Sequence, residues 1–344
     1  MNIQRSRPTA RPSRARGLTL VELMIALVLG MILIGGVLVV FLGSQQSFST
    51  SDNLSKMQDS ARIAFSLMAQ EVREASSTGC GNGSRADNAI AKRNESILNA
   101  AQSASPAWWS VMGNGVQGYD ANVAAPAVSI GTGLAARTST TDAIQLAGAY
   151  GASYGIDAHD NVGNQFTLNT STPGIAANDV LIACDYKQST IFRSTGLATN
   201  KVSYSAGAAT NDNCGTALGY DTTNTCSTIS YKYDSLVSRL SRFKASTWYV
   251  GTGTNGRPSL YRVFLNGTPE EIAPGVNDMQ ITYLQIGNPI YADAVDISDW
   301  TQVISVRITL TFESQSANVS TATTGDRRLT TVATDTIMLR NRTP

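Results

Sequence analysis

Apolar and polar positions divide this chain sharply near its N-terminus. Between Leu18 and Leu42 the residues are apolar almost without interruption, and Glu22 is the only charged one. A helix rises about 1.5 Å per residue, so this stretch would extend roughly 37 Å, enough to cross a hydrocarbon core of roughly 30 Å. The pattern predicts a transmembrane helix over residues 18–42.

The segment before this helix, residues 1–17, is basic. It contains no acidic residue and five arginines: Arg5, Arg7, Arg11, Arg14 and Arg16. Positive charge beside a membrane span favours the cytoplasmic side, so the short N-terminal side should stay in the cytoplasm while the long C-terminal part crosses. A cleaved secretory signal would have a shorter apolar region that ends in a small-x-small site, and neither feature is present. We therefore expect the helix to remain as an anchor.

Helical periodicity continues beyond the apolar stretch, over residues 43–78. Apolar residues recur there mostly at three- and four-residue steps: Leu54, Met57, Ala61, Ile63, Ala64, Leu67, Met68 and Val72. Charged and amide side chains lie between them, and no proline interrupts residues 18–105. The pattern predicts one long helix with an apolar half and an amphipathic half that packs on a globular domain.

Strand-like runs separated by turn residues follow from residue 142 onward. They are Asp142–Ala147, Asp179–Cys184, Thr190–Arg193, Thr228–Tyr233, Thr247–Val250, Leu260–Leu265, Asp278–Ile286, Val303–Phe312 and Arg328–Leu339. Alternation is clearest from Ile304 to Leu310, where one face is apolar. An antiparallel sheet with one apolar face needs a cover, which the amphipathic helix half supplies. We predict an α+β fold: a long N-terminal helix packed on an antiparallel β-sheet domain with long loops, residues 79–344.

The region between residues 81 and 141 is rich in alanine, serine, glycine and asparagine. Its sequence predicts a short helix around Asn88–Ala100 and otherwise loops. Trp108 and Trp109 could anchor a partner subunit, but aromatic residues that cover a small core are the more common situation. The sequence assigns this region no role.

Glu22 is unusual because a carboxylate inside a membrane segment is costly and usually marks a function. One alternative needs no function: Thr19-Leu20-Val21-Glu22 fits the S/T-x-x-E capping box, in which the glutamate reaches back to the amide of Thr19. The residues alone leave both interpretations open.

Gly17 followed by Leu18-Thr19-Leu20-Val21-Glu22-Leu23 resembles the class III prepilin signal of type IV pilins and type II secretion pseudopilins. The resemblance implies cleavage by a membrane prepilin peptidase between Gly17 and Leu18, with N-methylation of Leu18. Most members begin with phenylalanine where this chain has leucine. In a filament, Glu22 of one subunit could meet the new ammonium group of Leu18 in another, so that neither charge is unpaired in an apolar core.

Four further passages resemble a narrower group, the PilW-like minor pilins of type IV pili. They are Ala61–Cys80, Trp248–Val250 with Pro258–Arg262, Ile272–Tyr283, and Leu339–Arg342. The resemblance implies a non-enzymatic structural subunit that helps to initiate pilus assembly at or near the tip. Its implied partners are other minor pilins, the major pilin, the prepilin peptidase, the inner-membrane assembly platform and, as a further option, a large tip adhesin.

Composition narrows the remaining classes. The chain has 26 basic and 25 acidic residues, and five of the basic ones lie in the leader, so the cleaved chain is mildly acidic. This argues against direct binding of nucleic acid, which usually uses a basic surface. Four cysteines, Cys80, Cys184, Cys214 and Cys226, fall on the side predicted to be oxidising. Four cysteines allow three pairings, of which we favour Cys80 with Cys184 and Cys214 with Cys226. The alternative is that one or both pairs are free, buried thiols. The sequence has no C-x-x-C pair of the kind that binds zinc.

Two motifs resemble those of enzymes but lack the required context. Gly151–Gly155 fits the G-x-S-x-G nucleophile elbow around Ser153. That motif needs a strand before it, a helix after it, and an acid and a histidine later in the chain. The only histidine, His159, is six residues after Ser153, so the context does not fit. Gly251–Gly256 fits G-x-G-x-x-G, but a strand-like run follows it, so a hairpin turn is the better interpretation. Acidic loops at residues 157–160 and 293–299 could hold calcium but lack EF-hand spacing, and solvated loops are the default.

Together the residues and the resemblance predict a minor pilin of the bacterial inner membrane, with its N-terminus in the cytoplasm, that later enters the periplasm and the pilus fibre. No cofactor or metal is implied. A minor pseudopilin of type II secretion would share nearly all of these features. From another class, a membrane-anchored hydrolase would need a pocket that joins Ser153, His159 and an acid, and an adhesin would bind a ligand directly.

Overall fold

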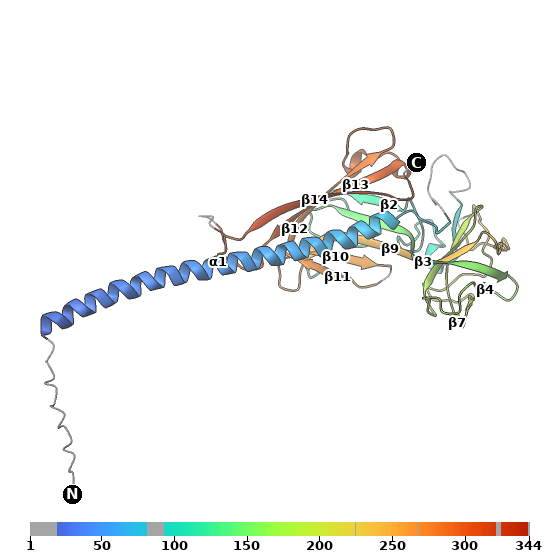
Figure 1. The fold of residues 1–344 in the computed structure, drawn as a ribbon. Coiled ribbons are helices and arrows are strands. Elements are labelled where there is room, and N and C mark those ends of the chain that lie inside the picture. Colours follow the sequence, from blue (N-terminus) through green and yellow to red (C-terminus); the bar gives the residue numbers. More distant parts are fainter. Residues whose placement is uncertain (1–18, 81–92, 224, 266, 321–324, 343–344) are drawn as a thin grey trace, which may run out of the picture. The chain divides into compact units, whose positions relative to one another are not determined.

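The computed structural model describes residues 19–80, 93–223, 225–265, 267–320 and 325–342 (Figure 1). The chain forms two compact units, one that ends at Asp52 and one that begins at Asn53. Helix α1, Leu20–Glu74, contributes to both. In the first unit, the large apolar side chains from Leu20 to Leu42 are 52–74% exposed. Among the described residues, α1 is the one helix long and apolar enough to cross a membrane.

In the second unit, α1 buries one stripe of side chains. Met57, Ala64, Met68 and Val72 are buried at steps of seven or four residues, as the amphipathic pattern predicts. They join the main core of this unit.

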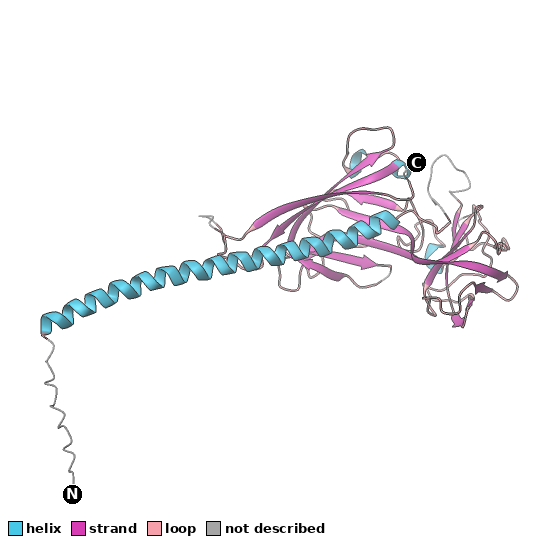
Figure 2. Ribbon diagram, viewed as in Figure 1, coloured by secondary structure: helices cyan, strands magenta, loops and turns pink. Residues whose placement is uncertain are grey.

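A three-stranded antiparallel sheet lies against this stripe. It consists of β12 (Val276–Gln285), β13 (Val303–Glu313) and β14 (Thr330–Met338), in that order. Alternate residues of β12 and β13, such as Ile281 and Ile308, enter the same core as the helix. The strands and the helix therefore bury each other's apolar faces, which confirms the predicted α+β class (Figure 2).

The larger sheet has eleven strands. They are β1 (Asn94–Ser96), β2 (Val116–Tyr119), β3 (Ala143–Asp160), β4 (Gln165–Leu168), β5 (Val180–Cys184), β6 (Ser189–Arg193), β7 (Gly196–Ala198), β8 (Lys201–Ser203), β9 (Arg239–Thr252), β10 (Pro258–Phe264) and β11 (Glu270–Pro274). The main path runs β1-β6-β5-β9-β3-β4-β8-β7; β10 pairs with β9 and β11, and β2 pairs with β3. The β1–β6 pair is parallel and the other pairs are antiparallel. Short 3-10 helices are η1 (Asn99–Ala101), η2 (Ala294–Asp296) and η3 (Trp300–Gln302).

The two longest strands, β3 and β9, extend into a second lobe of this unit. Their register shifts between Tyr150 and Ser153, where Gly151 has a φ of +72° that a side chain would disfavour. Beyond this bulge, residues 153–240 carry β4 to β8 and enclose a separate core that includes Phe166 and Phe192. We call residues 153–240 the disulfide lobe. Figure 1 shows β4 and β7 of this lobe at the end of the unit opposite the entry of α1.

One predicted helix and one predicted strand are not formed. Of the predicted helix at Asn88–Ala100, residues 88–92 lie outside the described chain, and the rest forms β1, an isolated bridge at Leu98 and the start of η1. The predicted strand at Thr228–Tyr233 is irregular. Its alternation reflects Tyr231 and Tyr233, whose rings meet edge to face with centroids 5.0 Å apart, rather than strand pairing.

Candidate assembly site: the helix and its attachment to the sheet

The N-terminal turn of α1 contains the acid singled out in the sequence. The amide of Glu22 donates to Thr19 Oγ1 at 3.3 Å, and the amide of Thr19 donates to Glu22 Oε2 at 3.5 Å. This is the reciprocal geometry of a capping box, one of the two interpretations that the sequence left open. Gly17 and Leu18 lie outside the described residues, so pairing of Glu22 with a neighbouring N-terminus stays a prediction. In an isolated chain the cap supplies Glu22 with local partners.

Near the other end of α1, Glu71 attaches the helix to β9 and β10. One carboxylate oxygen accepts from Ser246 Oγ at 2.5 Å and from Trp248 Nε1 at 2.7 Å. The other oxygen binds Lys244 Nζ and, at 3.0 Å, Arg262 Nη1. The Arg262 guanidinium also lies over the Trp248 ring, 5.5 Å from its centroid. One carboxylate oxygen is therefore bound by a hydroxyl and an indole, and the other by two cationic groups.

Burial and ion pairing act on Glu71 in opposite directions. Its side chain is 4% exposed, and this burial raises its pKa, but the charge of Lys244 and the hydrogen bonds to the carboxylate outweigh burial, so the pKa is lowered overall. A buried ion pair stabilises a fold weakly compared with apolar packing, but removal of one partner is costly. We infer that this cluster mainly fixes the position of the helix along the sheet.

The C-terminal segment holds the residues that follow α1. Arg342 is 2% exposed, and its Nη1 donates to the carbonyls of Trp300 at 2.5 Å and Val303 at 3.0 Å. Its Nη2 donates to Ser76 Oγ at 2.6 Å and to the carbonyl of Asn114. Burial lowers the pKa of this guanidinium to about 10. The C-terminus is thereby tied to the residues that follow the helix.

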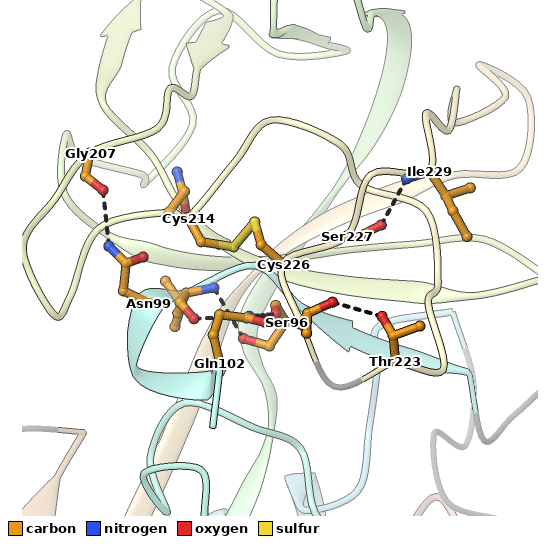
Figure 3. Close-up of a disulfide and its surroundings, with 12 residues drawn as sticks. Ser96, Asn99, Gln102, Gly207, Cys214, Thr223, Cys226, Ser227 and Ile229 are labelled. Atoms are coloured by element: carbon orange, nitrogen blue, oxygen red, sulfur yellow. Dashed lines mark hydrogen bonds between the residues drawn. A yellow bond between two sulfur atoms is a disulfide. The ribbon is translucent and has the colours of Figure 1, made fainter. Parts of the chain in front are cut away.

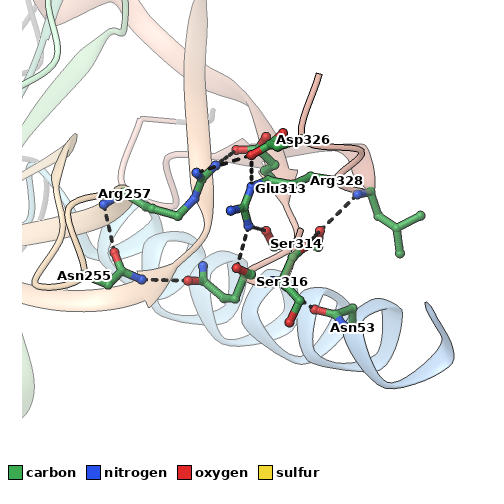
Figure 4. Close-up of polar contacts among 10 residues, drawn as sticks. Asn53, Asn255, Arg257, Glu313, Ser314, Ser316, Asp326 and Arg328 are labelled. Carbon is green, nitrogen blue, oxygen red and sulfur yellow. Dashed lines mark hydrogen bonds and ion pairs between the residues drawn. The ribbon is translucent and has the colours of Figure 1, made fainter. Parts of the chain in front are cut away.

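A third attachment lies where α1 enters the second unit (Figure 4). Asn53 is buried, and its side-chain oxygen accepts from the amide of Ser316 at 3.4 Å. The loop that carries Ser316 is itself held by Arg328, which donates to the carbonyl of Ser314 at 2.8 Å and pairs with Asp326 at 2.5 Å. Polar contacts at Asn53, at Glu71 and at Ser76, two residues after the helix, thus hold the part of α1 that belongs to the second unit.

Both predicted cysteine pairs form disulfides. Cys80, six residues after the end of α1, bonds to Cys184 at the end of β5. Cys214 bonds to Cys226 within the disulfide lobe (Figure 3). The amide of Cys214 donates to the carbonyl of Ile97 at 2.7 Å, and thereby ties the residues around β1 to this lobe. No free cysteine is present.

The enzyme-like motifs serve structural roles. Ser153 lies inside β3 rather than between a strand and a helix. His159 Nδ1 accepts from the amide of Tyr233 at 3.1 Å, so its Nε2 carries the proton and donates to the Tyr204 hydroxyl at 2.8 Å. Burial lowers the pKa of His159 to about 4. With both ring nitrogens engaged, His159 is not available as a general base for Ser153.

The glycine-rich segment lies in a turn, whereas residues 157–160, expected as an acidic loop, form the end of β3, and residues 293–299 include η2. Residues 252–258 connect β9 to β10 as an antiparallel hairpin, which matches the turn predicted for the glycine-rich segment. Asp160 accepts from the amides of Val162 and Gly163, and Asp299 accepts from the amide of Thr301. Within the described ranges, no group of three or more histidine, cysteine, aspartate or glutamate residues is arranged to hold a metal ion.

The roles of Glu71, Arg137 and Arg342 were not identified from the sequence. Glu71 carries a usable signal, since it follows Met68 by three residues and precedes Ala75 by four, which places an acid on the buried stripe. Arg137 is fully buried, and its guanidinium donates to four carbonyls, including those of Val123 at 2.6 Å and Thr141 at 2.6 Å. No local pattern in the sequence distinguishes it from a surface arginine.

Comparison with known proteins matches both ends of the chain. Residues 12–38 match the prokaryotic N-terminal methylation motif, and residues 247–341 match the family model of type IV pilus-assembly protein W. No curated protein matches the chain. Among solved structures, the type IV-like pilin TTHA1219 from Thermus thermophilus is similar at 12% identity, over 30% of this chain and 67% of that one, with a TM-score of 0.20. The chain thus carries a prepilin-type N-terminal methylation motif and a type IV pilus-assembly protein W region.

Proposed function

We propose that this protein is a minor pilin, a structural subunit that is cleaved between Gly17 and Leu18 and helps to initiate assembly of a type IV pilus at or near its tip. Residues 1–17 are the leader, 18–42 the transmembrane helix, 43–78 its amphipathic continuation and 79–344 the domain outside the cytoplasm. The subunit begins in the inner membrane with a cytoplasmic N-terminus and ends in the fibre. It performs no chemical reaction of its own.

One observation carries this proposal: a single helix has an exposed apolar half and a half fixed by polar contacts to a sheet. Side chains of the apolar half that are 52–74% exposed need lipid or other helices around them. Two of the four partners of Glu71, Trp248 and Arg262, lie within the region matched to pilus-assembly protein W, as do the strands β12 and β13 that pack against the helix. A prepilin motif, an apolar helix half and a helix half fixed to a sheet are the parts that a subunit needs to leave a membrane and enter a fibre.

The mechanism is an exchange of surroundings. In the membrane, lipid tails cover the apolar half of α1; in the fibre, apolar halves of neighbouring subunits replace them. Glu22 then exchanges its local capping contacts with Thr19 for an ion pair with the N-terminal ammonium group of a neighbouring subunit. In this chain that first residue is Leu18. The partners are other minor pilins, the major pilin, the prepilin peptidase, the inner-membrane assembly platform and a tip adhesin.

The test compares the protein from cells with and without prepilin peptidase. Mass spectrometry of the N-terminal peptide should find Leu18 as first residue only when the peptidase is present, with a methyl group where that modification occurs. Sheared fibres should contain the mature protein at far lower amounts than the major pilin, and immunogold label should lie at fibre ends. A mature protein that keeps its arginines, or that is absent from fibres, would contradict the proposal.

A further inference from the structure

The last strand, β14, is the outer strand of the three-stranded sheet, drawn in dark red in Figure 1. Its hydrogen-bond register can be followed at both ends. The amide of Leu339 donates to the carbonyl of Ile304, and the carbonyl of Leu329 accepts from the amide of Ser314. In an antiparallel pair, alternate residues exchange both bonds with the partner strand and the others turn both groups away. Odd-numbered residues of β14 therefore bond to β13, and even-numbered ones face the open edge.

Three even-numbered residues at the centre of β14 present this edge: Val332, Thr334 and Thr336. The strand pairs with β13 alone among the described strands, and it is nine residues long. Four of its nine side chains are threonine, and one is charged, Asp335. A long edge strand of β-branched residues with little charge is a template for pairing with another chain, and soluble proteins usually avoid it.

One contact moderates this edge. The amide of Thr336 donates to Asp335 Oδ1 at 2.8 Å, so the carboxylate of the preceding residue covers one edge donor. An acid at an edge strand is a known means of discouraging unwanted pairing. It also selects: an incoming strand that carries a lysine or arginine near Asp335 would neutralise the charge, whereas an acidic one would be repelled.

We propose that the open edge of β14 accepts an extended segment of a neighbouring pilus subunit, with a basic side chain placed against Asp335. The occupant adds a fourth strand to the sheet and bonds through its backbone to residues 332–336. On its exposed face, Val332 and Met338, 61% and 55% exposed, offer apolar contacts to alternate side chains of the added strand. This inference rests on the proposed function, because it needs assembly with another subunit.

A proline variant tests the backbone contact. Thr334→Pro removes an edge amide donor without removing a bond to β13, and proline is tolerated where the amide faces away from the sheet. Thr334→Val is the matched control: it loses the hydroxyl contact with Thr309, as the proline variant does, but keeps the amide. Loss of the backbone bond and the bulk of the proline ring should lower recovery of Thr334→Pro in sheared fibres by about tenfold or more, while Thr334→Val stays near the wild type.

The two proposals fail separately. If the wild type is absent from fibres, the proposed function fails; if Thr334→Pro enters fibres as the wild type does, the strand-addition proposal fails. If Thr334→Pro unfolds at a lower temperature than Thr334→Val, its loss from fibres could reflect instability, and the charge variants decide instead. Asp335→Lys should be excluded from fibres, whereas Asp335→Asn should be incorporated. Equal incorporation of these two variants overturns the proposal. If the purified full chain forms a dimer and Thr334→Pro abolishes that dimer, the edge binds a second copy of this chain, and the proposal is also overturned.

Discussion

Glu71→Gln removes the charge that fixes α1 to the sheet while it keeps the size of the side chain. Glutamine retains one acceptor oxygen but places an amide NH2 where the second carboxylate oxygen was. Donors occupy both sides of the carboxylate: Ser246 and Trp248 on one oxygen, Lys244 and Arg262 on the other. Whichever way the amide turns, donors meet donors, and a buried partner loses its acceptor.

The size of the effect follows from burial. Removal of one partner from a buried ion pair costs about 3–5 kcal/mol, and one unsatisfied buried donor costs about 1–3 kcal/mol. The side chains of Lys244 and Arg262 are 15% and 21% exposed, so they can turn partly toward water. We therefore expect the lower end, about 3 kcal/mol, which corresponds to a Tm lower by roughly 5–10 °C for a domain of this size.

Glu270→Gln is the matched control because it removes the other acid on the same arginine. Glu270 binds Arg262 Nη2 at 2.8 Å, but its side chain is 55% exposed, so its loss should cost no more than about 0.5 kcal/mol. Thermal unfolding of the full chain in detergent, followed by circular dichroism with disulfides intact, measures both variants. If the Tm of Glu71→Gln lies within 2 °C of that of Glu270→Gln, the assigned role of Glu71 is refuted.

The pH dependence gives a second check on Glu71. Since the folded state lowers the pKa of Glu71 from its ordinary value of 4.5, its stabilisation is complete above pH 4.5 and is lost as the pH falls through the lower folded-state pKa. The gap in Tm between wild type and Glu71→Gln should therefore be constant near neutral pH and narrow in acid. A gap that widens in acid would contradict the sign of this pKa shift.

Three further predictions concern other parts of the chain. Arg342→Met should lower the free energy of unfolding by about 3 kcal/mol or more, measured by thermal unfolding, because the substitution leaves buried carbonyls without a donor. Arg340→Met, at an exposed position, should change the free energy of unfolding by less than about 0.5 kcal/mol. Replacing Cys80 and Cys184 together by serine should cost about 5 kcal/mol, against about 3 kcal/mol for the other disulfide, because the closed loop is longer; equal losses would argue against the loop-entropy account. Glu22→Ala should be processed normally but recovered less in purified fibres, and wild-type recovery would count against its pairing role.

The sequence was sufficient to predict those helices and strands that carry a long, regular pattern of apolar and polar residues. The apolar run and the one-sided periodicity after it define α1 almost to its last turn, and alternation identifies β12, β13 and β14. Short strands such as β7 and β8, three residues each, are too brief to show a period, so their pairing depends on neighbours that the chain reaches only by folding. The extent of the disulfide lobe was therefore not predictable.

The same distinction applies to the site. The position of Glu71 on the buried stripe is visible in the sequence, but its partners Lys244 and Arg262 lie 173 and 191 residues further along. Arg342 was noted as part of a resemblance, yet nothing local indicates that it enters the core. Long-range polar partners are set by the tertiary fold, and one sequence without its fold does not determine them.

The disulfide between Cys80 and Cys184 has a mechanical consequence. Cys80 lies six residues after the end of α1, and Cys184 ends β5 in the disulfide lobe. Any force applied to this lobe would reach the helix through the covalent bond and the six residues after α1, so the pairing of β3 with β9 would not bear that load alone. The linkage therefore holds the lobe to its own helix even where the sheet contacts open.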